Sequence, residues 1–234
     1  MYRREFVKTV VAGSTFLLLA KPAKSEDVFV FVVDSKKCIG CGKCVVGCRA
    51  ENNVPEGKFR TWVERYVVTS NGDIENVYVE SPHGGEYGFE DIEIEEDSVL
   101  RAYFVPKLCM QCDKPPCVKV CPVNATWLTE EGVVLIDKSH CIGCKYCIQA
   151  CPYGARYFDH HEKVVDKCTW CYHRVMRGMK PACVTVCPTG ARMFGRLSDE
   201  SIQKVLKERN VRILKPELNT RPKVFYKNIG WEVW

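Results

Sequence analysis

Apolar positions along the chain gather in short runs that predict β-strands. The run at residues 28–33 is continuous, β-branched and aromatic, which indicates a buried strand. Residues 60–69 and 74–80 predict two strands on either side of an Asn-Gly pair, a dipeptide typical of a hairpin turn. Residues 99–105 predict a further strand, so the first half of the chain is expected to be rich in sheet.

The second half of the chain continues with shorter elements. Residues 132–137 and 155–158 predict strands before and after a group of cysteines. Residues 199–208 have the apolar spacing of a helix, with a Ser-Asp cap at the start. Residues 211–214 and 223–226 are predicted as strands or as an extended arm.

Two surface features are candidates for contacts with a partner. Residues 86–97 hold seven acidic side chains in twelve positions, and we favour a solvated loop over a docking surface for them. Trp231 and Trp234 in the tail are candidate anchors to another subunit.

Residues 1–25 have the pattern of a targeting segment. Arg3 and Arg4, followed by an apolar residue and a lysine, resemble a twin-arginine export signal, and an apolar run of twelve residues, 9–20, follows. Twelve apolar residues are too few to span a bilayer, although a short amphipathic or anchoring helix is the alternative. Lys21 stands where a cleavage site needs a small residue before Ala23, so the leader is expected to be poorly cleaved. We therefore expect an exported protein, periplasmic or on the outer face of the cytoplasmic membrane.

The composition argues against nucleic acid as a partner and against a membrane span after the leader. The formal net charge of +5 counts the cysteines as neutral, and it would be lower if they bound metal as thiolates, so the basic balance is no argument for nucleic acid. No basic stripe with interleaved aromatic residues is present either. No apolar stretch of about 18 residues follows the leader, so we expect membrane association only through a partner subunit.

The sixteen cysteines carry the chemistry. They fall into four groups of four: Cys38, Cys41, Cys44 and Cys48; Cys109, Cys112, Cys117 and Cys121; Cys141, Cys144, Cys147 and Cys151; Cys168, Cys171, Cys183 and Cys187. The third group has the C-x2-C-x2-C-x3-C-P spacing with which bacterial ferredoxins hold [4Fe–4S] clusters. The second and fourth groups are stretched copies, and the first has Arg49 in place of the final proline. Iron–sulfur clusters are therefore favoured over disulfides and over zinc, which uses separated pairs of cysteines.

The chain also repeats itself. Residues 151–158 read Cys-Pro-Tyr-Gly-Ala-Arg-Tyr-Phe, residues 187–194 read Cys-Pro-Thr-Gly-Ala-Arg-Met-Phe, and residues 121–126 are a weaker third copy. Each copy predicts a strand, a cysteine loop, a short helix, a turn and a strand. Two copies make one ferredoxin-like unit, so four copies make two.

These motifs resemble a known family over residues 28–195. The four cysteine groups, the stretched second and fourth groups and the leader are similar to the electron-transfer subunit with four [4Fe–4S] clusters of dimethyl sulfoxide reductase-type molybdopterin oxidoreductases. That family includes polysulfide, tetrathionate, thiosulfate and arsenate reductases, and similar subunits serve nitrite reduction by quinol and a membrane complex of sulfate reducers. The motifs are specific for the family but not for the substrate.

The resemblance implies how the groups share clusters, which spacing alone leaves open. Groups one and four are expected in one unit, and groups two and three in the other. The implied ligands are Cys38, Cys41, Cys44 and Cys187 for cluster 1; Cys168, Cys171, Cys183 and Cys48 for cluster 2; Cys109, Cys112, Cys117 and Cys151 for cluster 3; Cys141, Cys144, Cys147 and Cys121 for cluster 4. Some relatives have tryptophan at the position of Cys147 and hold a [3Fe–4S] cluster, so its presence here predicts four [4Fe–4S] centres.

The expected fold class is α+β, with two interlocked bacterial-type dicluster ferredoxin-like units, a β-hairpin insertion and a C-terminal extension. The divisions that follow from the groups are a leader at 1–25; a first unit, called unit one, at 28–56 and 161–197; a β-rich insertion at 57–105; a second unit, called unit two, at 106–160; and a C-terminal helix and partner-binding arm at 198–234.

We expect no catalysis by this chain alone, because the sequence has no catalytic triad, phosphate loop or open metal site. The resemblance implies an electron relay between a polytopic quinone-binding membrane subunit and a molybdopterin catalytic subunit in an anaerobic respiratory complex. The alternatives are a free-standing exported polyferredoxin and a scaffold stabilised by clusters. Lys43, Arg49 and Lys145 lie beside cysteine groups, where a cation raises a cluster potential, but solvated surface charges are favoured for them.

Overall fold

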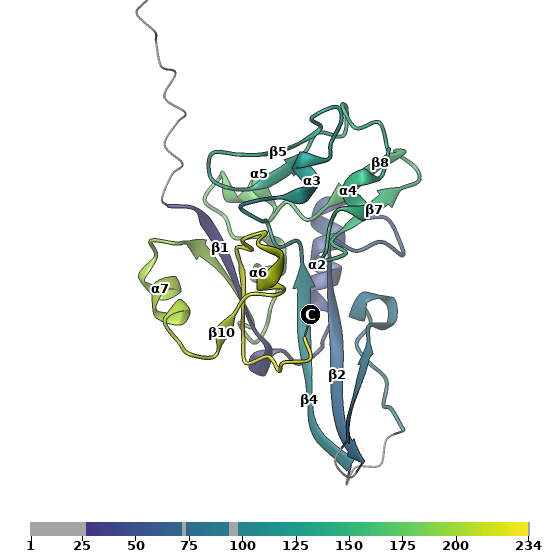
Figure 1. Ribbon diagram of the computed structural model, residues 1–234, viewed down its shortest axis with the longest axis vertical. Helices are drawn as coiled ribbons and strands as arrows, with labels where there is room; N and C mark the ends of the chain where they lie inside the picture. The colour runs from purple at the N-terminus through teal and green to yellow at the C-terminus, as the bar shows by residue number, and fades with distance from the viewer. Residues whose placement is uncertain (1–26, 72–73, 94–97, 234) are drawn as a thin grey trace, which may run out of the picture.

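The computed structural model describes residues 27–71, 74–93 and 98–233 (Figure 1). The predicted leader, with Arg3 and Arg4, lies outside these residues, as does Trp234. Short helices and small, mainly antiparallel sheets make up the described chain, which is consistent with the α+β class. No helix within the described ranges is long and apolar enough to cross a membrane.

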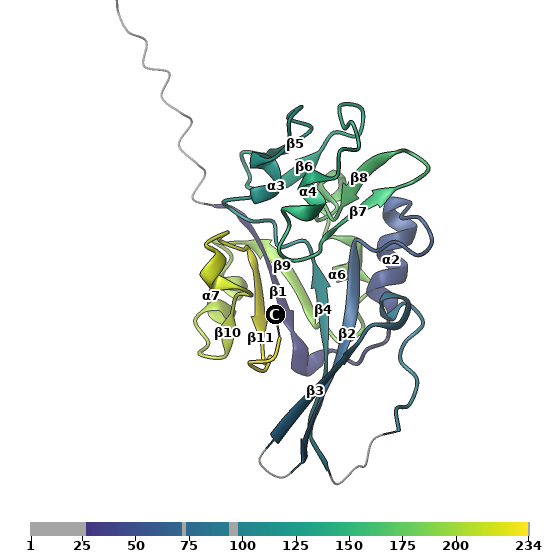
Figure 2. The ribbon, with the colours of Figure 1, turned by 45° about the vertical axis from the view of Figure 1, so that its right-hand side comes forward.

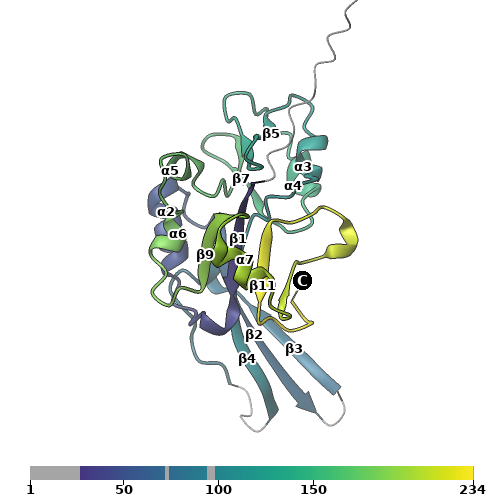
Figure 3. The same cartoon turned by 90° about the vertical axis from the view of Figure 1, so that its left-hand side faces the viewer.

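A four-stranded sheet joins the two ends of the described chain. Strand β1 (Phe29–Asp34) is the predicted apolar run, and all six of its residues are buried. It pairs antiparallel with β9 (Arg192–Arg196) and parallel with β11 (Val224–Lys227), so it lies between two strands from much later in the chain (Figure 3). The short β10 (Val211–Arg212) completes the sheet beside β11. Residues 224–227 therefore form a strand inside this sheet rather than an extended arm.

The second sheet is a long ribbon that projects from the rest of the molecule (Figure 2). Its order is β3 (Ile74–Glu80), β2 (Thr61–Asn71) and β4 (Val99–Leu108), all antiparallel. Asn71 pairs with Ile74 at the end of the hairpin, so the prediction from the Asn-Gly pair is confirmed. Strand β4 runs three residues beyond the predicted end and delivers the chain directly to Cys109.

Two small hairpins flank the cysteine loops in the upper part of the molecule (Figure 1). Strand β5 (Thr126–Leu128) follows the second cysteine group and pairs with β6 (Val134–Ile136), which precedes the third. Strand β7 (Arg156–Asp159) follows the third group and pairs with β8 (Val164–Lys167), which precedes the fourth.

Each cysteine group is accompanied by a short helix. The helices at the groups are α2 (Lys43–Asn52), α3 (Pro116–Lys119), α4 (Tyr146–Gln149), α5 (Tyr172–Val175) and α6 (Ala182–Thr185). Outside the groups lie α7 (Glu200–Leu206) and the 3-10 turns η1 (Ser35–Lys37), η2 (Pro82–Gly85) and η4 (Pro216–Leu218). Helix α2 packs on α6, and α3 packs on α4, so the helix of group one meets that of group four, and the helix of group two meets that of group three.

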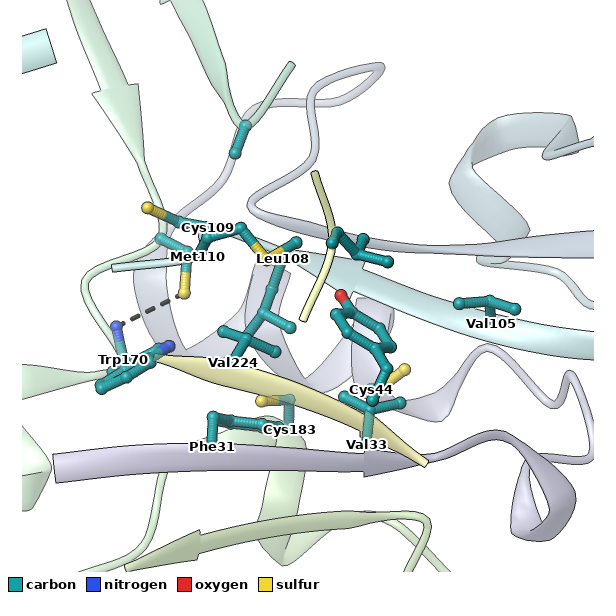
Figure 4. Close-up of a cluster of buried hydrophobic side chains, with 14 of the residues drawn as sticks. Phe31, Val33, Cys44, Val105, Leu108, Cys109, Met110, Trp170, Cys183 and Val224 are labelled. Atoms are coloured by element: carbon teal, nitrogen blue, oxygen red, sulfur yellow. Dashed lines mark hydrogen bonds between the residues drawn. The ribbon is translucent and has the colours of Figure 1, made fainter. Parts of the chain in front are cut away.

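Cysteines are part of the hydrophobic core. Phe31 and Val224 pack in one buried cluster with Cys44, Cys109 and Cys183 (Figure 4). Residues with sulfur therefore occupy positions that an ordinary domain of this size would fill with aliphatic side chains.

Trp170, which lies between Cys168 and Cys171 in the sequence, is fully buried in this core. It lies edge-on to Phe194, with ring centroids 5.5 Å apart. Its backbone N–H donates to Cys168 Sγ at 3.4 Å, the contact drawn as a dashed line in Figure 4. The residue therefore both fills the core and orients a neighbouring sulfur.

The C-terminal tail returns to β4 and is held there by a buried carboxylate. Glu232 accepts hydrogen bonds from Tyr103 Oη at 2.6 Å and from Arg101 Nε at 3.1 Å. Burial by itself would raise the pKa of Glu232, but these hydrogen bonds outweigh it and hold the pKa below its usual value of 4.5. Trp231 beside it is 60 % exposed, so the tail is fixed while this ring faces solvent.

Replacing Glu232 with glutamine should destabilise the protein in a pH-dependent way. Because the folded-state pKa is depressed, the carboxylate contributes stability above pH 4.5, and that contribution disappears as the pH falls through the folded-state pKa. At pH 7 the loss of a charge-assisted hydrogen bond should cost about 2 kcal/mol. The measurement is the thermal midpoint of wild type and Glu232→Gln at pH 7 and pH 4, with the exposed Glu217→Gln as control. A gap between wild type and Glu232→Gln of the same size at both pH values would contradict the assignment.

Candidate metal centres

The structure brings together cysteines that are far apart in the chain. All sixteen are unpaired thiols, and only Cys41 and Cys144 are exposed. No three His, Cys, Asp or Glu side chains within the described residues converge closely enough to hold a single metal ion. Eight of the thiols line two cavities instead, which is the arrangement that a cluster of several atoms requires.

One cavity is lined by three cysteines of group one and one of group four. Cys38, Cys41, Cys44 and Cys187 surround a space of about 320 Å³. Burial raises the pKa of the Cys38 thiol to about 11, and the nearby thiols of Cys44 and Cys187 act in the same direction. A thiol with so high a pKa gives little thiolate at neutral pH unless a cation replaces its proton, and iron binding is such a replacement.

A second cavity repeats this arrangement with groups three and two. Cys141, Cys144, Cys147 and Cys121 line a space of about 300 Å³. The backbone N–H of Val165 donates to Cys141 Sγ at 3.5 Å. Hydrogen bonds of this kind to a ligand sulfur stabilise the charged form and tune a bound cluster.

The remaining eight cysteines form two more sets in the interior. Asn52 Nδ2 lies 3.6 Å from both Cys48 Sγ and Cys171 Sγ, so one amide links a sulfur of group one to a sulfur of group four. Burial and the charges of Cys168, Cys183 and Cys171 raise the pKa of the Cys48 thiol well above its usual value. Cys48 therefore lies with three cysteines of group four although it belongs to group one in the sequence.

The last set shows the same kind of crossing between groups two and three. Burial and then the charges of Cys109, Cys117 and Cys151 raise the pKa of the Cys112 thiol to about 12. Cys151 belongs to group three in the sequence, yet it lies among three cysteines of group two. In all four sets, three sulfurs come from one group and the fourth comes from the other group of the pair.

A buried ion pair holds Asn52 in place. Arg60 Nη1 donates to Asn52 Oδ1 at 2.8 Å, and Arg60 Nη2 lies 2.8 Å from Asp166 Oδ2. Burial would raise the pKa of Asp166, but the charge of Arg60 and its hydrogen bonds hold that pKa below its usual value. Arg60 thus binds the oxygen of the Asn52 amide and orients its nitrogen toward the two sulfurs.

The cysteine loops depend on close approach of the backbone. Gly42 has a φ of +67°, and a side chain there would collide with the carbonyl oxygens of Gly85 and Glu86. Lys145, at the equivalent place in group three, has a φ of +65° and a solvent-exposed side chain. Positive φ alone therefore does not demand glycine in these loops, whereas the neighbouring chain does.

The sequence favours solvated surface charges for the three cations near the cysteine groups, and none of the three is buried in the structure. Arg49 Nη2 is paired with Glu86 Oε2 at 2.6 Å, which also brings the start of the acidic stretch against group one. Lys43 is exposed, and Lys145 Nζ lies 4.2 Å from the centroid of the Phe158 ring. Two buried arginines that sequence reasoning did not single out, Arg156 and Arg192, lie among the sulfurs instead. The signal that marks them is the repeated Cys-Pro-x-Gly-Ala-Arg sequence.

Comparison with known proteins places the chain in the class that this geometry defines. Two models of a 4Fe-4S dicluster domain match, one over residues 37–125 and the other over residues 100–197. The B subunit of the Archaeoglobus fulgidus tetrathionate reductase is 46 % identical over 87 % of this chain and 83 % of its own length. The B subunit of the Salmonella typhimurium tetrathionate reductase is 41 % identical over 96 % and 87 %, and the B polypeptide of the Wolinella succinogenes polysulfide reductase is 39 % identical over 82 % and 90 %.

The chain therefore belongs to the family of iron–sulfur B subunits of the dimethyl sulfoxide reductase type, whose members serve tetrathionate, polysulfide, thiosulfate, dimethyl sulfoxide and selenate reductases. This is the family that the sequence resembles, and its members are electron-transfer subunits rather than enzymes on their own.

Replacing Gly42 with alanine should remove iron from one centre. The new side chain would strike the backbone at residues 85–86 and displace the loop that holds Cys41 and Cys44. Gly190→Ala is the matched control, because Gly190 has a φ of +65° but no atom within 4 Å of a new side chain, so only strain of about 1–2 kcal/mol is expected. The measurement is iron per chain after anaerobic purification. Equal iron contents in the two variants would contradict the role of close approach.

Proposed function

We propose that the protein holds four [4Fe–4S] clusters and relays electrons through them. The proposed ligand sets are Cys38, Cys41, Cys44 and Cys187 for cluster 1; Cys168, Cys171, Cys183 and Cys48 for cluster 2; Cys109, Cys112, Cys117 and Cys151 for cluster 3; Cys141, Cys144, Cys147 and Cys121 for cluster 4. The observation that carries this proposal is that two separate cavities are each lined by four cysteines, three from one group and one from a distant group.

The effects of thiols on one another's pKa link neighbouring sets and support the cluster order 1, 2, 3 and 4. The charge of Cys44 in the first set raises the pKa of Cys183 in the second set. The charge of Cys109 in the third set raises the pKa of Cys168 in the second set. Cys117 of the third set acts in the same way on Cys147 of the fourth. Electron transfer needs neighbouring centres, and this order provides a single path through the chain.

The middle step of this path is held by two buried polar side chains. Gln111 donates from Nε2 to the carbonyl oxygen of Cys168 at 2.9 Å and accepts from the backbone N–H of Val134 at 2.7 Å. Lys167 Nζ donates to the carbonyl oxygens of Val134 and Cys168. Both side chains are fully buried, so they join the loops that carry Cys109 and Cys168 and exclude water between them.

The two ends of the path reach the surface. Cys41 in the first set and Cys144 in the fourth are the exposed cysteines. Ile39 and Ile142, each two residues before one of them, are 59 % and 63 % exposed. Exposed apolar side chains beside a ligand are suited to contacts with an electron donor at one end and an acceptor at the other.

The ligand sets imply two interlocked ferredoxin-like units. Unit one takes residues 28–56 and 161–197 and includes clusters 1 and 2, and unit two takes residues 106–160 and includes clusters 3 and 4. The pairing of β1 with β9 and of β5 with β6, and the packing of α2 on α6 and of α3 on α4, support this division. The ribbon at 57–105 is then an insertion, and residues 198–234 form a C-terminal extension with a partner-binding surface around Trp231.

In the cell, we propose, these electrons pass between a polytopic quinone-binding membrane subunit and a molybdopterin catalytic subunit, with quinol as the favoured donor. The names of the relatives support a reductase complex, since they are B subunits or electron-transfer subunits of reductases. Arg3 and Arg4 support export through a route that carries folded proteins, so the complex would work at the outer face of the cytoplasmic membrane.

Bound clusters supply reversible one-electron chemistry, and the chain's own residues determine where it occurs. Sixteen thiolates fix the four positions, while Asn52 and the backbone N–H groups of Val165 and Trp170 donate to sulfurs and stabilise their charge.

Cysteine replacements test whether each cluster takes three ligands from one cysteine group and its fourth ligand from another. Cys41→Ser and Cys187→Ser, although 146 residues apart in the chain, should abolish the same paramagnetic signal, because both are proposed ligands of cluster 1. Cys183→Ser is the control, since it lies in the same sequence group as Cys187 but is a proposed ligand of cluster 2. The measurement is electron paramagnetic resonance of the reduced protein together with an iron analysis, for which the wild type should give about sixteen iron atoms per chain. Loss of one common signal in Cys183→Ser and Cys187→Ser, with Cys41→Ser affecting another, would overturn the ligand sets.

Export is tested at the leader. The double replacement of Arg3 and Arg4 with lysine should leave the chain in the cytoplasm with its full iron content, because folding and cluster insertion precede transport. Cell fractionation and iron analysis measure the two quantities. Export of the double variant at the wild-type level would contradict the twin-arginine route.

A further inference from the structure

Two arginines are buried in the described chain without a carboxylate partner. Arg156 is 5 % exposed and Arg192 is 3 % exposed, and neither forms an ion pair with any acid among the residues that the structure describes. Each has one guanidinium nitrogen, Arg156 Nη2 and Arg192 Nη1, that is buried and has no hydrogen-bond partner. A buried cation without a counter-ion is costly, so a negative charge is expected beside each of them.

Arg192 lies between the first and second sulfur sets. Its Nη2 is 3.3 Å from Cys44 Sγ of the first set. Its charge also acts on Cys183 of the second set. Burial by itself would lower the pKa of Arg192, but the thiols of Cys44, Cys183 and Cys38 raise it above the usual value. The groups that face this guanidinium are therefore sulfurs of two different clusters.

Arg156 is the matching residue of the repeat, and the thiols that act on its charge belong to the third and fourth sets. Burial opposes its charge, while the thiols of Cys117, Cys147 and Cys109 favour it, and the net effect raises its pKa. Cys117 and Cys109 belong to the third set, and Cys147 belongs to the fourth. Thiols of both sets therefore act on this guanidinium, which is buried and has one nitrogen, Nη2, without a hydrogen-bond partner.

The two arginines occupy equivalent positions in the sequence repeat and make equivalent hydrogen bonds. Both arginines stand five residues after the last cysteine of their group, in the sequence Cys-Pro-x-Gly-Ala-Arg. Arg192 Nη2 donates to Thr61 Oγ1 at 2.8 Å, and Arg156 Nη1 donates to Thr126 Oγ1 at 3.2 Å. Each threonine lies at the start of the strand that follows the other cysteine group of the pair. Each proposed unit thus has one arginine at a matching position, hydrogen-bonded to Thr126 within unit two and to Thr61 at the start of the insertion that follows the first part of unit one.

From this geometry we infer that Arg192 sets the reduction potentials of clusters 1 and 2 together, and that Arg156 does the same for clusters 3 and 4. The inference rests on the proposed ligand sets. Adding one electron to a thiolate-bound cluster takes its charge from about 2− to about 3−, so a permanent positive charge in a low-dielectric gap favours the reduced form of both neighbours. Because each arginine is close to the ligands of two clusters, it raises both potentials together and does not widen the step between them.

Arginine is suited to this position for two reasons. Its guanidinium remains charged at all working pH values, so the potentials that it sets do not change with pH. In Arg192 a single nitrogen, Nη2, reaches both a sulfur and a threonine hydroxyl, which fixes the charge beside Cys44. The paired Arg60, by contrast, is neutralised by Asp166 and acts on the sulfurs mainly through Asn52.

The test uses the full chain, loaded anaerobically and titrated with reductant while its paramagnetic signals are recorded. Arg192→Met should lower the midpoints of two of the four centres, with about a tenfold change in the reduction equilibrium of each, which is 59 mV for one electron. Arg156→Met should lower the midpoints of the other two centres, so each variant is the control for the other. Arg192→Lys and Arg156→Lys retain the charge and should recover most of the shift.

Several outcomes would overturn the inference while leaving the proposed function intact. Unchanged midpoints in Arg192→Met with four intact signals would do so, as would a shift of all four centres by either variant. A lysine variant that shifts as far as the methionine variant would assign the effect to packing rather than charge. If a methionine variant loses iron, its lysine variant decides, because charge alone should restore the wild-type midpoints. A wild-type chain with much less iron than four clusters need would count against the proposed function itself.

Discussion

The meeting of sulfurs from distant parts of the chain is the constraint on which the rest of the structure depends. Cys187 joins a loop that begins at Cys38, and Cys48 joins the loop of group four. No local segment can complete its own set, so strands and helices must fold the chain back on itself before any site is whole. The sheet of β1, β9 and β11 and the packing of α2 on α6 serve this purpose in one half of the molecule.

The interior that results is unusual in its electrostatics. Thiols occupy core positions, and burial raises the pKa of most of those for which a shift is resolved, so the interior is unfavourable for free thiolates. Iron removes that conflict, because it replaces the protons and gives the sulfurs a counter-charge. Buried arginines and backbone N–H groups then face the remaining negative charge. Cofactor binding and core packing therefore depend on each other in this protein, because the clusters fill space that apolar side chains fill elsewhere.

Much of the local structure could be predicted from the sequence, because the signals are local. A continuous apolar run marks β1, and an Asn-Gly pair marks the β2–β3 hairpin. The position of β11 beside β1 could not be predicted, since parallel pairing between such distant segments leaves no mark in either of them. Asn52 and Arg192 were missed for a similar reason: their roles come from sulfurs that lie 119 and 148 residues away. The repeat around Arg192 was visible, but only the fold shows which groups it faces.

The position of β1 has a consequence for biosynthesis. Both of its neighbours, β9 and β11, are made long after it, so during translation this strand stays without partners until residues 192–227 have left the ribosome. An apolar strand with two open edges is prone to association with other chains, and contacts between distant residues form slowly. The first sheet is therefore completed only late in synthesis. A chaperone that covers β1 until β9 and β11 have been made would prevent this association.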